Sequence, residues 1–280
     1  MLYRVFVAKK PVGRLITHKI GRRGIAEGAL RGSLVSASMV RAPLRPRNDP
    51  AQYDDLAGEW WRPDGAFAAL HWLAAARARL IPPAPPGGGV LVDIACGGGL
   101  LAPHVPTGYR HIGVDRNAVA LAEAARHGVE TIEGDVTALP LDDAVADVVV
   151  AGEIFEHVED LEGCVAEVAR VLAPGGTLVF DTIADTRFAR LALVTVGERV
   201  PGGPPRHIHD PRLFVGPPRL RALLARHGLE VTLMRGLRPS ARDYVRFLAD
   251  RRRPVRMLPT RSLAAVYHGT ACRTPPVVAA

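Results

Sequence analysis

Apolar and polar residues follow two different periods along the middle of the chain. Short runs rich in Val, Ile and Leu predict strands that are buried on both faces, and apolar residues spaced three or four apart between them predict helices. Strict alternation of strand and helix indicates right-handed βαβ units, an α/β fold whose mostly parallel sheet has helices on both faces. Seven strands are expected, at residues 90–94, 111–115, 130–133, 147–151, 177–181, 229–235 and 262–270, with helices at 117–127, 161–172 and 217–227.

The pattern before the first strand is helical. Tyr53, Leu56 and Trp60 recur at helical spacing, so residues 48–80 predict a helical N-terminal cap. Prolines at 82–86 then make a stiff linker. The expected parts are a basic extension (1–47), the cap and linker (48–86), the α/β domain (87–272) with an insertion (186–216), and a tail (273–280).

The net charge of +8 is distributed unevenly. Residues 1–47 carry a net charge of +10, residues 48–234 of −10, and residues 235–280 of +8. Because the central body is acidic, the high overall charge does not indicate nucleic-acid binding. An acidic body also does not repel a cationic cofactor.

The basic extension has three interpretations. Its arginines, its serines and its near lack of acids suit a transit peptide. It also suits a disordered tail that touches an anionic surface. We favour a third, in which translation starts at Met39 and residues 1–38 are not native, because all three lysines of the chain lie at or before Lys19. No apolar segment is long enough for a secretory signal or a membrane span.

The three cysteines, Cys96, Cys164 and Cys272, are far apart and form no C-x-x-C pair. They predict neither a disulfide framework nor a thiolate zinc site, so we expect a reducing, cytoplasmic location. Cys96 is interpreted as a packed small residue, because no His or Lys adjoins it. The sequence gives no prediction of the oligomeric state.

A glycine-rich turn follows the first predicted strand. The strand runs into Ala95-Cys96-Gly97-Gly98-Gly99, and a helix is expected from Leu100. Glycines let a ligand approach the backbone closely, and a helix start adds free N–H groups and the positive end of a dipole. The turn therefore predicts a nucleotide-like cofactor site. Since Gly97-x-Gly99-x-x-Ala102 also fits the dinucleotide pattern, a nicotinamide or flavin enzyme is a rival interpretation.

Acidic residues stand where the next predicted strands end. In sheets of this kind, ligands bind beyond the carboxyl ends of the strands. Asp115 is placed to accept hydrogen bonds from ribose hydroxyls, and Asp135 to contact an adenine amino group. Alternatively, Asp115 caps the following helix and Asp135 is a turn residue. Glu153-x-x-Glu156-His157 follows the fourth strand, at the same edge of the sheet.

These features together resemble the class I S-adenosylmethionine-dependent methyltransferases, which share the glycine turn, both acids and the turn at residues 172–176. The resemblance is closer to the ubiquinone biosynthesis O-methyltransferases, over residues 53–239 and more weakly to 270. It implies their Rossmann-like fold. The residues that carry it are Trp60-Trp61, Gly65-x-Phe67, Leu70-His71, Arg77, Cys96-Gly97-Gly98-Gly99, Glu153-x-x-Glu156-His157, His209-Asp210 and Phe214-x-x-Pro217.

The resemblance implies O-methyl transfer from S-adenosylmethionine to a small hydroxylated aromatic, above all a polyprenylated quinone precursor. Arg77 would reach the methionine carboxylate of the cofactor. Glu153, Glu156 and His157 would be catalytic and hold Mg²⁺, with His157 as the base where no metal binds. The same cluster occurs in relatives without metal, so metal binding stays open. The expected cofactor residues are Arg77, Asp93, Ala95, Cys96, Gly97, Gly99, Asp115, Arg116, Asp135, Val136 and Gly152, and the expected substrate residues are Trp60, Trp61 and His209.

The chain departs from the family pattern at two positions. Ala95 stands where the family usually has Gly, and Gly152 where a larger apolar residue often flanks the adenine, so altered cofactor affinity is expected. The insertion mixes apolar residues with arginines. We interpret it as a lid packed on the domain, with peripheral contact at the inner face of the membrane as the competing hypothesis.

Other functions are left open by the sequence. One is a metal-independent small-molecule methyltransferase of secondary metabolism. The others are a nicotinamide-binding oxidoreductase and a cofactor-binding module without turnover. Binding of S-adenosylhomocysteine but not NADH would favour the methyltransferases.

Overall fold

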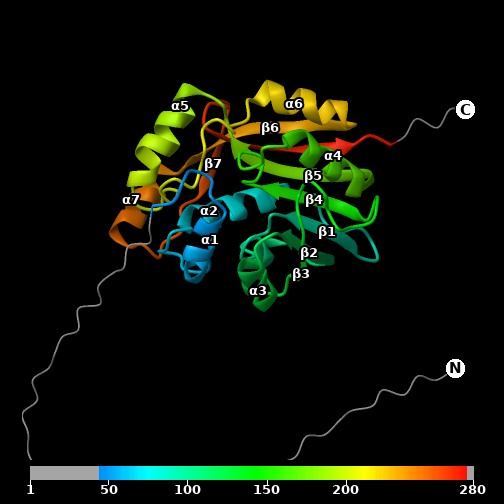
Figure 1. Cartoon of the computed structure of the whole chain (residues 1–280), viewed down its shortest axis with the longest axis horizontal. Helices are drawn as coiled ribbons and strands as arrows, with labels where there is room; N and C mark the ends of the chain where they lie inside the picture. Colours follow the sequence, from blue (N-terminus) through cyan, green and yellow to red (C-terminus); the bar gives the residue numbers. More distant parts are fainter. Residues whose placement is uncertain (1–43, 276–280) are drawn as a thin grey trace, which may run out of the picture. The chain divides into compact units, whose positions relative to one another are not determined.

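The computed structural model describes residues 44–275, and Figure 1 shows their arrangement. The expectations for residues 1–43 and for the last five residues lie outside the described part. One sheet of eight strands has the order β3-β2-β1-β4-β5-β8-β6-β7. β1 to β5 pair in parallel, whereas β8 pairs antiparallel with β5 and β6, and β7 antiparallel with β6. The strands are β1 (Gly89–Ile94), β2 (Tyr109–Asp115), β3 (Glu130–Glu133), β4 (Ala146–Gly152), β5 (Leu172–Ile183), β6 (Leu229–Pro239), β7 (Met257–Thr260) and β8 (Val266–Arg273).

Helices cover both faces of the sheet, and the cap precedes it. α3 begins where the Asn117 side chain accepts a hydrogen bond from the Ala120 N–H, as is typical of Asn at a helix N-cap. The α-helices are α1 (Ala51–Asp55), α2 (Ala68–Arg77), α3 (Ala118–Arg126), α4 (Leu161–Val171), α5 (Arg187–Ala189), α6 (Pro217–Arg226) and α7 (Ala241–Ala249). Short 3-10 turns are η1 (Ala57–Glu59), η2 (Ala78–Leu80), η3 (Ala102–His104) and η5 (Gly197–Arg199), and η4 (Arg190–Val196) is a π-helix that continues α5.

Apolar residues on both sides of the parallel strands form the core. Val92 and Val149 belong to a cluster with Val165 of α4 and Leu220 of α6. On the other side of the sheet, Leu91, Val148, Val150 and Val179 pack with Ile81 and Leu101. Burial on both faces explains why these strands are continuous apolar runs rather than alternating ones.

Strand register brings the loops at one edge of the sheet together. Ile94 at the end of β1 pairs with Ala151 of β4, and Gly152 at the end of β4 pairs with Asp181 of β5. Asp115 at the end of β2 pairs with Glu133 of β3. The loops after β1, β2, β4 and β5 therefore begin side by side, as parallel pairing requires.

Three parts of the structure differ from the sequence-based expectations. β7 adds an eighth strand at the edge, and α7 is a helix that the sequence analysis did not predict. The expected helix from Leu100 is wrong: the chain forms turns and the three-residue η3, since Pro103 and Pro106 limit helix growth there. The glycine turn therefore has no long helix dipole behind it. Among the described residues, no helix has both the length and the apolar character needed to cross a membrane.

Candidate functional site

The glycine turn after β1 has a left-handed backbone that is covered by the cap. Ala95 has φ +53° and Gly97 has φ +52°. A Cβ at Gly97 would lie 2.5 Å from the Trp60 indole, so a larger residue would not fit. The Trp61 Nε1–H donates to the Gly98 carbonyl oxygen at 2.8 Å. Trp60 and Trp61, expected at the substrate, thus contact the turn expected to hold the cofactor.

Asp115 holds the glycine turn to the start of α3. Its Oδ2 accepts a hydrogen bond from the Gly97 N–H at 2.9 Å, and its Oδ1 accepts one from the Asn117 N–H at 2.8 Å. Burial raises the pKa of this carboxyl, and the two N–H donors oppose that rise. Asp115 therefore joins the glycine turn to Asn117, and it is the Asn117 side chain that caps α3.

The other expected nucleoside contacts differ in exposure. Asp135 is exposed, and its Oδ1 accepts hydrogen bonds from the Thr137 N–H and hydroxyl at 2.8 and 2.7 Å, which lowers its pKa. Arg116 is also exposed, and Val136 is partly buried. Asp93 and Cys96 are buried. Burial raises the pKa of the Cys96 thiol, which agrees with a packed rather than a reactive residue.

Arg77 of α2 lies buried across the ends of β4 and β5. Its Nη1 forms an ion pair with Oδ1 of Asp181, a fully buried residue of β5. Gly152 makes this path possible, because a Cβ at that position would overlap the Arg77 guanidinium. The departure at Gly152 therefore has a physical reason that the sequence did not reveal. Nε of Arg77 and Oδ2 of Asp181 have no hydrogen-bond partner among the described residues.

Glu153 begins the loop after β4 next to this ion pair. It has φ +51°, and its N–H donates to Oδ1 of Asp181 at 2.8 Å. Burial and the neighbouring carboxyls of Glu156 and Asp181 raise the pKa of Glu153, and Arg77 opposes that rise. Glu153 Oε1 is also buried and has no partner within residues 44–275. Burial opposes the charge of the Arg77 guanidinium, but the carboxyls of Asp181, Asp93 and Glu153 all act on it and raise its pKa.

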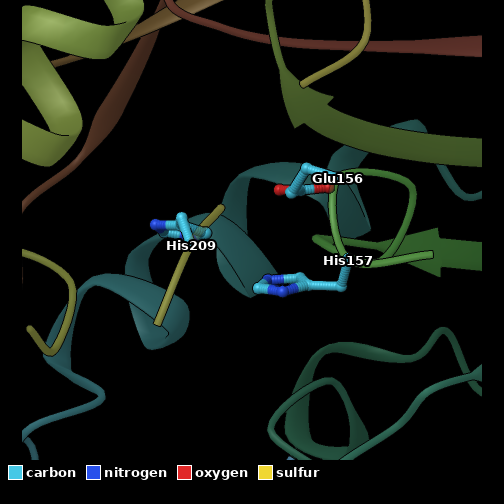
Figure 2. Close-up of side chains that lie close together, drawn as sticks. All are labelled: Glu156, His157 and His209. Carbon is cyan, nitrogen blue, oxygen red and sulfur yellow. The ribbon is translucent and has the colours of Figure 1, made fainter. Parts of the chain in front are cut away.

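Glu156, His157 and His209 form a second cluster beside the first. One ligand atom from each lies within 4.8 Å of the others. Figure 2 shows Glu156 and His157 projecting from the loop after β4, with His209 approaching from a separate segment. Glu156 Oε2 accepts a hydrogen bond from the Thr182 hydroxyl at 2.8 Å, whereas Glu156 Oε1 and His209 Nδ1 are buried without a partner in the described part. These unpartnered atoms are suited to bind a cation or a polar ligand.

Burial sets the charge of this second cluster. It raises the pKa of Glu156 to about 7 and lowers the pKa of His157 to about 4. It also lowers the pKa of His209, and the neighbouring His157 adds to that effect. Both imidazoles are therefore neutral at pH 7, which is the form that binds a metal or accepts a proton.

Asn48 fixes the tautomer of His157. Asn48 Nδ2 donates to the His157 carbonyl oxygen at 3.0 Å, so the other end of the amide, Oδ1, faces the ring Nδ1 at 2.5 Å. A carbonyl oxygen can only accept, so Nδ1 carries the proton. The lone pair of the neutral ring is consequently on Nε2.

The metal ligands expected from the resemblance are not all in one group. The structure brings Glu156 and His157 together with His209, whereas Glu153 lies beside Arg77 and Asp181. Two imidazoles and one carboxylate suit Zn²⁺ or another transition metal better than Mg²⁺, which prefers oxygen ligands. Neither Asn48 nor Asp181 was expected at the site from the sequence pattern. For Asp181 a signal existed, since it ends a predicted strand at the ligand-binding edge.

Comparisons with known proteins agree with this architecture. A family model described as "Methyltransferase domain" matches residues 92–180. The ubiquinone biosynthesis O-methyltransferase of Thiobacillus denitrificans is 32% identical over 196 residues, 67% of this chain and 84% of that protein. That of Hahella chejuensis is 34% identical over 205 residues, 69% of this chain and 86% of that protein.

Solved structures share the fold at lower identity. A SAM-dependent methyltransferase from Thermotoga maritima, described as a possible histamine N-methyltransferase, has a TM-score of 0.58 and 17% identity, covering 79% of this chain and 98% of its own. The [4+2]-cyclase SpnF has a TM-score of 0.53 and 18% identity, covering 83% and 98%. Because these neighbours differ in reaction, the fold alone does not identify the chemistry.

Proposed function

This chain belongs to the ubiquinone biosynthesis O-methyltransferase family of S-adenosylmethionine-dependent methyltransferases, and from that premise we propose that its methyl acceptor is a hydroxylated aromatic precursor of ubiquinone. The relatives named for this activity match about two thirds of the chain. The alternative of a nicotinamide enzyme is not favoured, since the relatives and the family model agree on methyl transfer.

The observation that carries the proposal is the Glu156–His157–His209 cluster, in which Glu156 and His157 project from the loop after β4. A phenol has a pKa near ~10, so an acceptor hydroxyl at neutral pH is a poor nucleophile without help. Neutral His157, with its lone pair on Nε2, accepts a hydrogen bond from a bound phenol, and Glu156, whose pKa burial raises to about 7, is the stronger general base for its proton. Glu156 and His209 hold the hydroxylated edge of the acceptor next to His157. Trp60 and Trp61 remain candidates for the apolar wall.

The cofactor is assigned to the loops after β1, β2, β3 and β4. S-adenosylmethionine, when bound, supplies a methyl group on a positively charged sulfur for in-line transfer to the acceptor oxygen. Asp115 would take the ribose hydroxyls and Asp135 the adenine, and the unpartnered Nε edge of Arg77 fits a carboxylate. The remaining residues of this assignment are Asp93, Ala95, Cys96, Gly97, Gly99, Arg116, Val136 and Gly152.

A divalent cation fits the second cluster. Glu156, His157 and His209 offer one carboxylate oxygen and two imidazole nitrogens within reach of each other, and two of these groups have unpartnered buried atoms. A bound cation would lower the pKa of a coordinated phenol. The donor set favours Zn²⁺ or Mn²⁺, and Mg²⁺ is the alternative that the resemblance implies.

The insertion after β5 is a candidate contact for the membrane that would carry a polyprenylated acceptor. Ala189 and Val194 are buried against the domain, which agrees with a lid. Phe188, Leu191 and Val196 are exposed on the same segment, next to arginines. One face thus packs as a lid, and the other is free to lie in an anionic interface.

The proposal is tested with isotopically labelled S-adenosylmethionine and a panel of catechols with and without prenyl chains. Labelled methyl ethers of prenylated catechols are expected, and labelling of none of the panel would contradict the proposal. Parallel reactions after EDTA treatment, with Mg²⁺, Mn²⁺ or Zn²⁺ restored separately, decide the metal. His209→Gln should weaken metal binding, measured by calorimetry, more than Glu153→Gln does if the cluster in Figure 2 is the ligand set.

A further inference from the structure

An ion pair joins the segment that leads into the cap to the last turn of the helical insertion. Arg47 Nη1 donates to Glu198 Oε1 at 2.7 Å, and Nη2 donates to Oε2 at 3.4 Å. The Glu198 side chain, in η5, is only 3% exposed, whereas that of Arg47 is 32% exposed. Buried charges in proteins are paired, so this carboxylate holds the guanidinium in place although 151 residues separate the two.

The same guanidinium also holds the backbone of His209. Arg47 Nη1 donates a second hydrogen bond, at 2.8 Å, to the His209 carbonyl oxygen. One guanidinium nitrogen carries two N–H groups, so Arg47 serves the carboxylate of Glu198 and this carbonyl at once. The backbone that carries the His209 imidazole therefore depends on where the ion pair places the guanidinium.

The next residue along the chain holds the other imidazole. Asn48 bonds the ring and the backbone of His157, and its own N–H donates to the His207 carbonyl oxygen at 3.0 Å. Gln52 Nε2 donates to the same His207 oxygen at 2.9 Å, which fastens this segment at a further point. Two consecutive residues thus hold the two imidazoles of the second cluster, whose ring centroids are 5.1 Å apart.

We propose that Arg47 and Glu198 are positioning residues, which couple η5 to the two imidazoles shown in Figure 2. Glu198 fixes the guanidinium, and the guanidinium fixes the His209 carbonyl and, through the next residue, the ring of His157. Among residues 44–275, the Glu198 carboxylate bonds Arg47 and neither imidazole, so it acts through the guanidinium. The effect of the pair on turnover rests on the proposed function, whereas its hold on the imidazoles does not.

Replacement of one or both partners separates positioning from stability. Arg47→Met leaves a buried carboxylate without its cation and should lower the melting temperature. The double variant Arg47→Met/Glu198→Met should recover most of that loss, because apolar residues of similar size often replace a buried ion pair without loss of stability. We expect kcat to stay about tenfold low in both variants, since neither restores the bond to the His209 carbonyl. Recovery of kcat together with the melting temperature would overturn the positioning role.

The imidazoles provide a second readout that needs no turnover. Long-range 1H–15N spectra of the full chain, labelled at histidine and kept in EDTA, distinguish the two neutral tautomers of each ring. The signals are assigned by their loss in His157→Gln and His209→Gln. Glu198→Met removes no hydrogen bond of either ring, yet it should shift the His209 signals and give His157 a mixture of tautomers in place of the Nδ1–H form alone. Unchanged signals of both rings would contradict the coupling.

Arg45→Gln is the matched control. The Arg45 side chain pairs with Asp49 and Asp55, so this variant also breaks an arginine–carboxylate contact in the same part of the chain. It should leave kcat and both sets of ring signals as they are in the unmodified chain. Calorimetry with S-adenosylhomocysteine should give affinities within about twofold of each other for every variant. A parallel loss of this affinity would indicate general loss of structure and would count against a positioning role.

The two readouts keep this inference apart from the proposed function. If the unmodified chain methylates no catechol of the panel, the proposed function fails, and the ring signals still decide the coupling. If the chain is active but Glu198→Met changes neither kcat nor the ring signals, the coupling is wrong and the proposed function stands. A loss of kcat at constant cofactor affinity, together with altered ring signals, supports the inference.

Discussion

Asn48 holds His157 by its ring and by its backbone at once, although 109 residues separate them in the chain. A residue of the cap thereby sets which nitrogen of the imidazole is free in the loop after β4. The cap is therefore part of the site as well as its cover.

Replacement of Asn48 by glycine tests this relationship. Asn48 has φ +58°, a conformation that glycine adopts without strain, so Asn48→Gly removes the amide and keeps the backbone. We expect kcat to fall by about tenfold, since one orienting hydrogen bond is lost. The affinity for S-adenosylhomocysteine should stay within about twofold of the unmodified chain. Steady-state kinetics and calorimetry measure both, and an unchanged kcat would contradict the positioning role.

Ala95 stores backbone strain in the glycine turn. Its φ of +53° is unfavourable for a residue with a Cβ, by roughly 1 kcal/mol or more. Ala95→Gly should raise the free energy of unfolding by about 0.5–1 kcal/mol, because relief of strain exceeds the added flexibility of the unfolded chain. Urea unfolding measures this change. Ala118→Gly, in the first turn of α3, should instead lower stability, and a loss in both variants would refute the strain.

Gly152 is required by the path of Arg77. A methyl group at this position overlaps the guanidinium, so Gly152→Ala should lower the free energy of unfolding by about 1–3 kcal/mol, as overpacking does. The affinity for S-adenosylhomocysteine should fall with it, since Arg77 must move. Gly216→Ala is the matched control, because no atom lies within 4 Å of a Cβ built there. Equal effects of the two substitutions would argue against the crowding.

The stability of the metal-free chain should depend on the ionisation of His157. Burial lowers its pKa to about 4 from the usual 6.5, so the unfolded chain binds more protons between these values. This imidazole therefore destabilises the fold progressively as the pH falls from about 6.5 to about 4. The raised pKa of Glu156 acts in the opposite direction, with stability decreasing as the pH rises from about 4.5 to about 7.

The contribution of His157 is isolated by comparison with His157→Gln. Urea unfolding in EDTA at pH 4.5, 5.5, 6.5 and 7.5 should show a smaller loss at acid pH for the variant than for the unmodified chain. Parallel curves for the two proteins would mean that the imidazole is not desolvated in the folded state.

The insertion gives a prediction for membrane contact. Leu191 is 56% exposed, so Leu191→Glu should reduce co-sedimentation with vesicles of anionic phospholipid without unfolding the protein. Val119, on α3, is 54% exposed, and Val119→Glu controls for the added charge. If Leu191→Glu sediments as the unmodified chain does, the insertion acts as a lid alone.

The sequence predicts the central sheet because its strands are buried on both faces, so that Val148, Val149 and Val150 form one continuous apolar signal. The edge strand β7 and the helix α7 are less predictable. β7 has only four residues including Pro259, so it has no clear apolar pattern. α7 does carry an apolar face, with Tyr244 and Phe247 packed in the core, which the prediction overlooked among its charged residues. The prediction of a helix after the glycine turn is wrong because prolines follow within a few residues.

The candidate site is predictable only where a strand ends in a polar residue. Asp115 and Glu153 could be found this way, because parallel strands bring their ends to one edge. Asn48 and His209 come from the cap and from the segment after the insertion, whose approach to the loop after β4 depends on tertiary packing. Tertiary contacts of that kind, between segments far apart in the chain, produce no periodic pattern in the sequence.

The Trp60 indole over Gly97 has a consequence for the rate of ligand association. In the proposed cofactor site, a nucleoside that binds against this turn would have to displace the indole, together with the aromatic stack that Tyr53 and Phe67 form with it. Association should then proceed more slowly than free collision, at a speed governed by the opening of the cap. The same displacement should change the intrinsic fluorescence of Trp60, so the time course of that fluorescence would report the rate at which the cap opens.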